Sequence, residues 1–139
     1  MSNQENWPQW LKDADTEDAV ITIHEDGMVV WHSGTWKDGV WEDGLWEGGT
    51  WEDGNWKSGV WYRGTWKEGR WCNGIWKRGL WKGGVWEGGT WLGGIWKGGI
   101  WLGGTWLGGL WQDGTWEGGT WDDGIWRGGI WESPIPRGE

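Results

Sequence analysis

The sequence of 139 residues is poor in the residue types that mark secreted, membrane-spanning and disulfide-bonded proteins. It contains no Phe, three Pro and a single Cys, Cys72, which leaves no disulfide framework and is typical of a reducing compartment. No secretory hydrophobic segment opens the chain, and no apolar run approaches the roughly 18 residues that a membrane span needs. These absences predict a cytoplasmic protein without a membrane contact.

Patterns that carry catalysis or metal binding are missing as well. His24 and His32 lack the Cys and His spacing of a zinc site, so we expect structural or solvated roles for both. Cys72 has no activating base beside it in the sequence. The Gly-Gly pairs are not followed by the Lys-Ser/Thr motif of a phosphate-binding loop. The sequence therefore predicts no enzyme, cofactor, metal or small-molecule substrate.

A period of five residues dominates the rest of the chain. Trp occupies every fifth position from Trp31 to Trp131, and a Gly follows three residues after each Trp from Gly34 to Gly129. In a helix this period would spread the Trp side chains around the axis, and Gly is unfavourable there. In a straight strand an odd period puts successive Trp on opposite faces. The chain must therefore bend once in each W-x-x-G-x pentad.

The Gly and the residue before it supply this bend. Pairs such as Asp38-Gly39 and Asn73-Gly74 are typical of turns with positive φ. In the short β segment around each Trp, successive side chains point to opposite faces, so Trp points inward and both of its neighbours point outward. The Gly two residues before Trp also points inward and leaves room for an indole. An outward Trp would bury Asn55 and Arg70 without partners. We predict an all-β solenoid whose structural core includes Trp36, Trp56, Trp76, Trp96 and Trp116.

The number of sides in one coil is less constrained by the pentad. Two, three and four corners all keep Trp inside, and stacked charges do not choose between them. Four sides stack Lys37 and Lys57 as like charges but alternate Glu47, Lys67 and Glu87 favourably. We predict a four-sided solenoid of about five coils.

Three segments follow from the pattern: an N-terminal cap at 1–30, the pentad repeat at 31–131 and a tail at 132–139. Within the cap, residues 1–6 are polar and expected to be disordered, and a short helix is expected near Pro8, ending around Asp13–Asp15. The β-branched runs 19–23 and 28–31 flank turn residues and predict a hairpin. Pro134 breaks the pentad, and together with Pro136 it is expected to stop strand addition. A stack of repeats needs such atypical ends.

Charge and hydropathy vary along the repeat. The formal net charge is -9, and residues 1–30 carry seven acids against one base. Residues 31–56 are acidic, residues 57–82 carry seven bases against one acid, and residues 83–111 hold one acid and one base. This neutral band places Leu at positions that are charged in most pentads. We interpret it as an apolar girdle for a protein partner or a homo-oligomer, formed by Leu92, Ile95, Ile100, Leu102, Leu107 and Leu110.

Written as Gly-[Thr/Val/Ile]-Trp-[Glu/Lys]-[Asp/Gly], the pentad resembles the pentapeptide-repeat proteins. The likeness covers 31–131, with Trp31 and its successors in the central place, where that family has Leu or Phe, and Gly34 and its successors in the small one. It implies a right-handed four-sided β-helix. A weaker resemblance is to MORN repeats, whose G-x-W-x-x-G element is similar to residues 34–39 but whose longer period is missing.

We expect a non-enzymatic interaction scaffold that associates through the apolar girdle. The alternative, implied by the resemblance, is an acidic DNA mimic that inhibits a DNA-handling enzyme such as gyrase. The repeat itself has a net charge of only -2 (ten bases, twelve acids) with a basic middle. Direct nucleic-acid binding is not expected, because the whole chain is acidic. Sugar or ice binding is not expected either, because the Thr residues that precede Trp are expected to form no regular ladder with two, three or four sides per coil.

Overall fold

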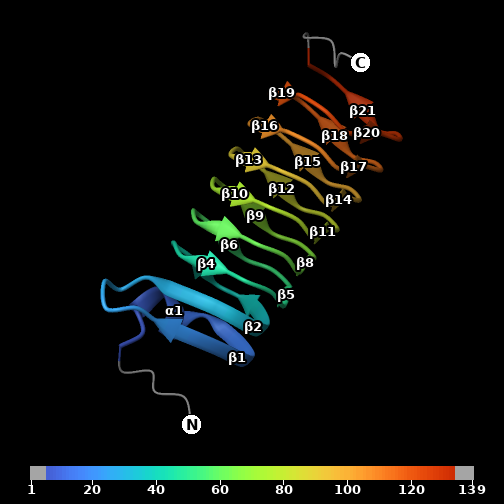
Figure 1. The fold of residues 1–139 in the computed structure, drawn as a ribbon. Helices are drawn as coiled ribbons and strands as arrows, with labels where there is room; N and C mark the ends of the chain where they lie inside the picture. The colour runs from blue at the N-terminus through green and yellow to red at the C-terminus, as the bar shows by residue number, and fades with distance from the viewer. Residues whose placement is uncertain (1–5, 134–139) are drawn as a thin grey trace.

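The described part of the chain contains first a short helix and a β-hairpin, and then winds into a β-solenoid (Figure 1). The computed structural model describes residues 6–133, so the predictions for Pro134 and Pro136 and for nearly all of residues 1–6 lie outside it. The helix α1 spans Gln9–Asp13. The strands β1 (Asp15–Ile23) and β2 (Val29–Asp38) pair antiparallel, as the hairpin prediction requires.

Nineteen two-residue strands follow, each made of a Trp and the residue before it, and they form three flat faces. Strand β2 starts faces 1 and 2. Face 1 continues with β4 (Leu45–Trp46), β7 (Val60–Trp61), β10 (Ile75–Trp76), β13 (Thr90–Trp91), β16 (Thr105–Trp106) and β19 (Thr120–Trp121). Face 2 continues with β5 (Thr50–Trp51), β8 (Thr65–Trp66), β11 (Leu80–Trp81), β14 (Ile95–Trp96), β17 (Leu110–Trp111) and β20 (Ile125–Trp126). Face 3 consists of β3 (Val40–Trp41), β6 (Asn55–Trp56), β9 (Arg70–Trp71), β12 (Val85–Trp86), β15 (Ile100–Trp101), β18 (Thr115–Trp116) and β21 (Ile130–Trp131).

Parallel pairing joins each strand to the strand fifteen residues later, for example Trp76 to Trp91. The backbone amide before each Trp donates to a Gly carbonyl of the previous coil, as Ile95 does to Gly79 at 2.9 Å. The β-solenoid prediction is therefore confirmed, but the number of sides is three instead of four. The seven strands of face 3 correspond to seven coils, where about five were expected.

Indole packing explains the three sides. Within a face the rings stack, with centroids 4.8 Å apart and planes 6° apart for Trp76 and Trp91. Between faces they meet edge to face, with centroids 5.8 Å apart and planes 75° apart for Trp76 and Trp81. Three large rings per coil thus fill the interior in both favourable aromatic geometries, whereas a square coil would have a wider centre to fill.

The inward orientation of Trp is confirmed, since every Trp from Trp31 to Trp116 has no exposed surface. The predicted core residues are all buried, but twenty-residue spacing distributes them over three columns: Trp76 on face 1, Trp36 and Trp96 on face 2, and Trp56 and Trp116 on face 3. Each column is continuous along the solenoid because its rings come from every coil.

The corner glycines are required mainly by the neighbouring backbone. Gly99 has φ +109°, and a Cβ added there would lie 2.4 Å from the carbonyl oxygen and 3.0 Å from the nitrogen of Gly84. At Gly114 the indole nitrogen of Trp96 also lies 3.1 Å from such a Cβ. The expectation that Gly makes room for an indole is thus only part of the reason, because the coil below comes closer than the indole.

The N-terminal elements cover the first coil. Leu11 of α1 is buried, and the Trp10 ring meets Trp41 edge to face with centroids 5.2 Å apart. Strand β2 runs across the predicted boundary between 30 and 31, so one strand belongs both to the hairpin and to the solenoid. This continuity fixes the orientation of the cap on the repeat.

Candidate functional surfaces

Of the polar side chains that the sequence analysis considered for chemistry, His32 and the corner carboxylates have structural partners, whereas Cys72 is a free thiol. His32 joins the hairpin to the second coil, with Nε2 2.8 Å from Thr22 Oγ1 and Nδ1 2.8 Å from Glu47 Oε1. Corner carboxylates accept from the next backbone amide, as Asp113 does from Gly114 at 2.9 Å, which agrees with turn chemistry. Within residues 6–133, no three His, Cys, Asp or Glu side chains are grouped to hold a metal ion. The same stretch contains no helix long and apolar enough to cross a membrane.

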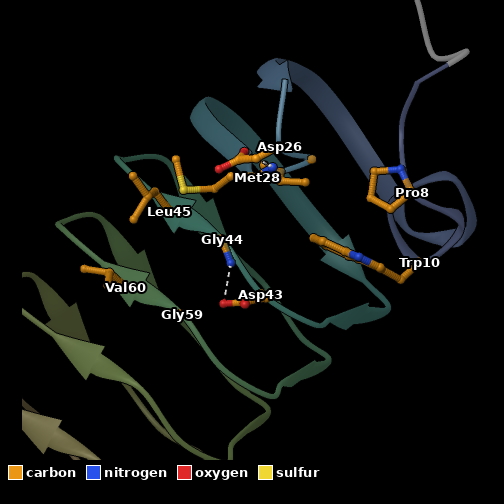
Figure 2. A pocket seen from close by; sticks show the side chains of 11 residues that line it. Pro8, Trp10, Asp26, Met28, Asp43, Gly44, Leu45, Gly59 and Val60 are labelled. Carbon is orange, nitrogen blue, oxygen red and sulfur yellow. Dashed lines mark hydrogen bonds between the residues drawn. The ribbon is translucent and has the colours of Figure 1, made fainter. Parts of the chain in front are cut away.

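A cavity of about 370 Å³ lies where the cap meets the first coils (Figure 2). Its lining includes the hairpin turn, Trp10 and the outward Leu45 and Val60. Its two carboxylates are already engaged, because Asp43 accepts from the Gly44 amide at 2.9 Å and Asp26 accepts from the Met28 amide at 3.0 Å. The cavity therefore offers a small molecule no convergent set of polar groups, and we assign it no ligand.

The outer surface of each face consists of two columns that run along the solenoid axis. One column holds the residue before each Trp and the other holds the residue after it, because alternation turns both outward. Register brings residues fifteen apart into direct contact along a column. Neighbours along an outer column are therefore fifteen residues apart in the sequence, and not twenty as a four-sided coil would require.

The predicted girdle is distributed over all three faces by this register. Leu92 and Leu107 are neighbours on face 1, Ile95 and Leu110 are neighbours on face 2, and Ile100 and Leu102 flank Trp101 on face 3. Five of the six side chains are exposed, between 36% and 40%, and Leu110 is half-buried. The residues form a band around the solenoid and not a single patch.

Face 2 carries a longer apolar column that the sequence reading missed. Leu80, Ile95, Leu110 and Ile125 follow one another in four consecutive coils, and Ile125 is 56% exposed. Beside them runs a column with exposed cations in three of these coils. We call this the basic surface of face 2, and it consists of Leu80, Ile95, Leu110 and Ile125 with Lys82, Lys97, Gln112 and Arg127.

Face 3 carries the opposite charge over the same four coils. The residues before Trp are mainly apolar, and Ile130 is 56% exposed. The residues after Trp are three Glu and one Leu, of which Glu87 forms an ion pair with Arg70 of the coil before. We call this the acidic surface of face 3, and it consists of Val85, Ile100, Thr115 and Ile130 with Glu87, Leu102, Glu117 and Glu132.

The basic residues of the middle coils extend from face 2 around the corner to face 1. An open groove of about 550 Å³ is lined by Arg63, Arg78, Lys77, Tyr62 and Glu47. The ammonium group of Lys77 lies 4.6 Å from the centroid of the Tyr62 ring, a cation–π contact. Arg63, Lys77 and Arg78 are all exposed, so the cations of the groove lack the desolvation that a tight anion site needs.

Threonines form two short ladders, and the expectation that no closure aligns them is wrong. Thr35, Thr50 and Thr65 pair in sequence on face 2, and Thr90, Thr105 and Thr120 pair in the same way on face 1. The error arose because a fifteen-residue period separates the Thr positions into columns. Each ladder is one residue wide, so neither forms a two-dimensional Thr array.

Comparison with family models, with curated proteins and with solved structures gives no match for this chain.

Proposed function

We propose that the protein is a non-enzymatic structural scaffold: a rigid solenoid with a Trp core that associates with proteins through its apolar outer band. The observation that carries this proposal is the exposure of large aliphatic side chains on a surface whose core is complete without them. Leu92, Leu102 and Leu107 are exposed although the neighbouring Trp rings are fully buried. Exposed aliphatic residues grouped in this way are typical of protein-interaction sites.

The acidic DNA mimic is the weaker alternative. Such a mimic presents acids along its length, as a duplex presents phosphates. Here the column after Trp on face 2 contains Lys67, Lys82 and Lys97 in consecutive coils. A cationic column repels the positively charged clefts that DNA-handling enzymes use, and this favours the scaffold.

We also infer a cytoplasmic location and a pentapeptide-repeat-like architecture in which three five-residue sides close each coil. The location is supported by the single Cys72, which is free and half-buried. The architecture is supported by the regular five-residue side, with one inward residue and one corner Gly in every pentad.

The scaffold is tested by measuring the molar mass of the wild type and of the triple variant Leu92→Lys/Leu102→Lys/Leu107→Lys by light scattering. We expect a mass above that of the monomer for the wild type, or a partner that co-purifies from the native host, and we expect the variant to lose either one. Three Lys at exposed positions leave the Trp core unchanged, so far-UV circular dichroism should be the same. A wild type that stays monomeric and recovers no partner would refute the scaffold.

A further inference from the structure

The basic surface of face 2 and the acidic surface of face 3 are complementary, and each combines an apolar column with a charged one. We propose that a second copy of this chain occupies both surfaces, with face 2 of one copy docked on face 3 of the next and the two solenoid axes antiparallel. This inference rests on the proposed scaffold function and names its partner. Of the three positions in the Leu→Lys variant only Leu102 lies in these two surfaces, because Leu92 and Leu107 lie on face 1. The two surfaces cover the same four coils and have the same coil spacing, so each coil of one surface can lie opposite one coil of the other.

The direction of the axes follows from the order of residues on a face. On every face the chain runs from the residue before Trp to the residue after it. When two such faces meet with parallel axes, the column before Trp of one copy lies opposite the column after Trp of the other, and Leu or Ile meets Glu. With antiparallel axes, equivalent columns lie opposite each other, so aliphatic side chains meet aliphatic ones and cations meet carboxylates.

Antiparallel alignment of the four coils then defines the contacts. The charged pairs are Lys97 with Glu117, Lys82 with Glu132 and Arg127 with Glu87, and Gln112 lies opposite the neutral Leu102. In the other column Leu110 faces Ile100, and the outer positions pair as Leu80 with Ile130, Ile125 with Val85 and Ile95 with Thr115. The central pair Lys97–Glu117 is the most informative, because Glu87 already has Arg70 as a partner within its own chain.

The same alignment disfavours contacts between identical faces. Two copies of face 2 would place Lys82 opposite Arg127, and two copies of face 3 would place Glu87 opposite Glu132. Like charges directly opposite each other destabilise a contact, so both symmetric dimers are rejected. The preferred contact is heterologous, which leaves one unused surface on every copy and allows assembly to continue beyond two chains.

The charges are tested by two variants that each reverse one surface. One is Lys82→Glu/Lys97→Glu/Arg127→Glu, and the other is Glu87→Lys/Glu117→Lys/Glu132→Lys. In sedimentation velocity at physiological salt, we expect each variant alone to associate at least about tenfold more weakly than the wild type. An equimolar mixture should regain association, because the reversed face 2 of one variant is complementary to the reversed face 3 of the other, and the two unmodified surfaces are complementary as in the wild type.

A matched control changes the same amount of charge outside the contact. Lys57→Glu/Arg63→Glu/Lys77→Glu alters positions on face 3 of an earlier coil, at a corner of face 1 and on face 1, and it should associate as the wild type does. Far-UV circular dichroism of all variants checks that they are folded. An equal loss in the control, no recovery in the mixture, or a wild type that is monomeric at every accessible concentration would overturn the proposal.

The antiparallel register is tested by zero-length carbodiimide crosslinking of an equimolar mixture of ¹⁴N and ¹⁵N protein. We expect a crosslink between Lys97 of one isotope and Glu117 of the other. A parallel contact would place Lys97 opposite the column before Trp, which has no carboxylate in these coils, so absence of the crosslink in an associating sample contradicts the register.

Failure of this inference can be told apart from failure of the scaffold. If the wild type associates and the triple Leu→Lys variant does not, but neither charge-reversed variant differs from the control, then the scaffold stands and the pairing of faces 2 and 3 is wrong. If a co-purifying partner is lost with the Leu→Lys variant while the purified wild type is monomeric, the scaffold again stands and the second copy is not the occupant.

Discussion

The N-terminal and C-terminal halves of the solenoid share one interior and differ in the outer residues that follow each Trp. Trp46 and Trp106, both on face 1, are fully buried, and each stacks on a Trp one coil away. The outer residue after Trp46 is Glu47, which bonds to His32, whereas the residue after Trp106 is the exposed Leu107. The repeat therefore fixes the core while leaving the surface free to vary from coil to coil.

This freedom has a structural cause. The hydrogen bonds that hold the coils together run between backbone groups, for example from the Leu107 amide to the Trp91 carbonyl at 2.8 Å. Side chains before and after Trp are not needed for this ladder. Charged side chains in one half and aliphatic side chains in the other are therefore compatible with the same backbone.

The largest expected loss of stability comes from removing one buried Trp, and removing one in each half tests whether the core is packed equally well in both. Trp46→Ala and Trp106→Ala each remove a fully buried indole, so we expect each to lower the free energy of unfolding by about 3–5 kcal/mol, and by the same amount within about 1 kcal/mol. Denaturant titration followed by circular dichroism measures both. A much smaller loss for one variant would show that its half of the core is packed differently.

A smaller loss of stability is expected at one corner of the C-terminal half, where two adjacent glycines should respond differently to substitution by Ala. Gly99→Ala places a Cβ 2.4 Å from the Gly84 carbonyl oxygen at φ +109°, so we expect a loss of about 2–4 kcal/mol. Gly98→Ala is the control, because its nearest neighbour, the Lys82 carbonyl oxygen, is 3.6 Å away, and a change below about 1 kcal/mol is expected. Equal losses in thermal or denaturant unfolding would contradict the backbone-contact explanation.

The smallest expected losses of stability come from removing a corner carboxylate, and we compare one such residue in each half. Asp43→Ala and Asp113→Ala each remove one bond to the following Gly amide, at 2.9 Å in both cases. The Asp43 bond is partly buried against the cap and the Asp113 bond is exposed, so we expect about 1–1.5 and about 0.5 kcal/mol respectively. Reversal of this order in denaturant titrations would show that the cap does not shield its corner.

The sequence allowed the type of fold and the direction of Trp to be predicted, because a five-residue period with Gly at a fixed place has few solutions. It did not allow the number of sides to be predicted, since that depends on how three or four indoles share a centre. A wrong number of sides also gives wrong neighbours on the outer surface. A column of four aliphatic residues forms only when residues fifteen apart are neighbours, and it consists of Leu80, Ile95, Leu110 and Ile125. The exposed leucines of the neutral band could be predicted, because Leu92, Leu102 and Leu107 differ from the corresponding residues of other pentads at any period.

The three-sided coil also determines how insertions and deletions act on this chain. Gain or loss of fifteen residues lengthens or shortens the solenoid by one coil and keeps every later side chain on its face. Gain or loss of a single pentad keeps the Trp core equally intact, yet moves every later outer residue to the next face. Placed before Leu80, one extra pentad would move the cationic column from face 2 to face 3 without disturbing a single later corner. In this architecture one short duplication can transfer an entire outer surface to the next face of the coil.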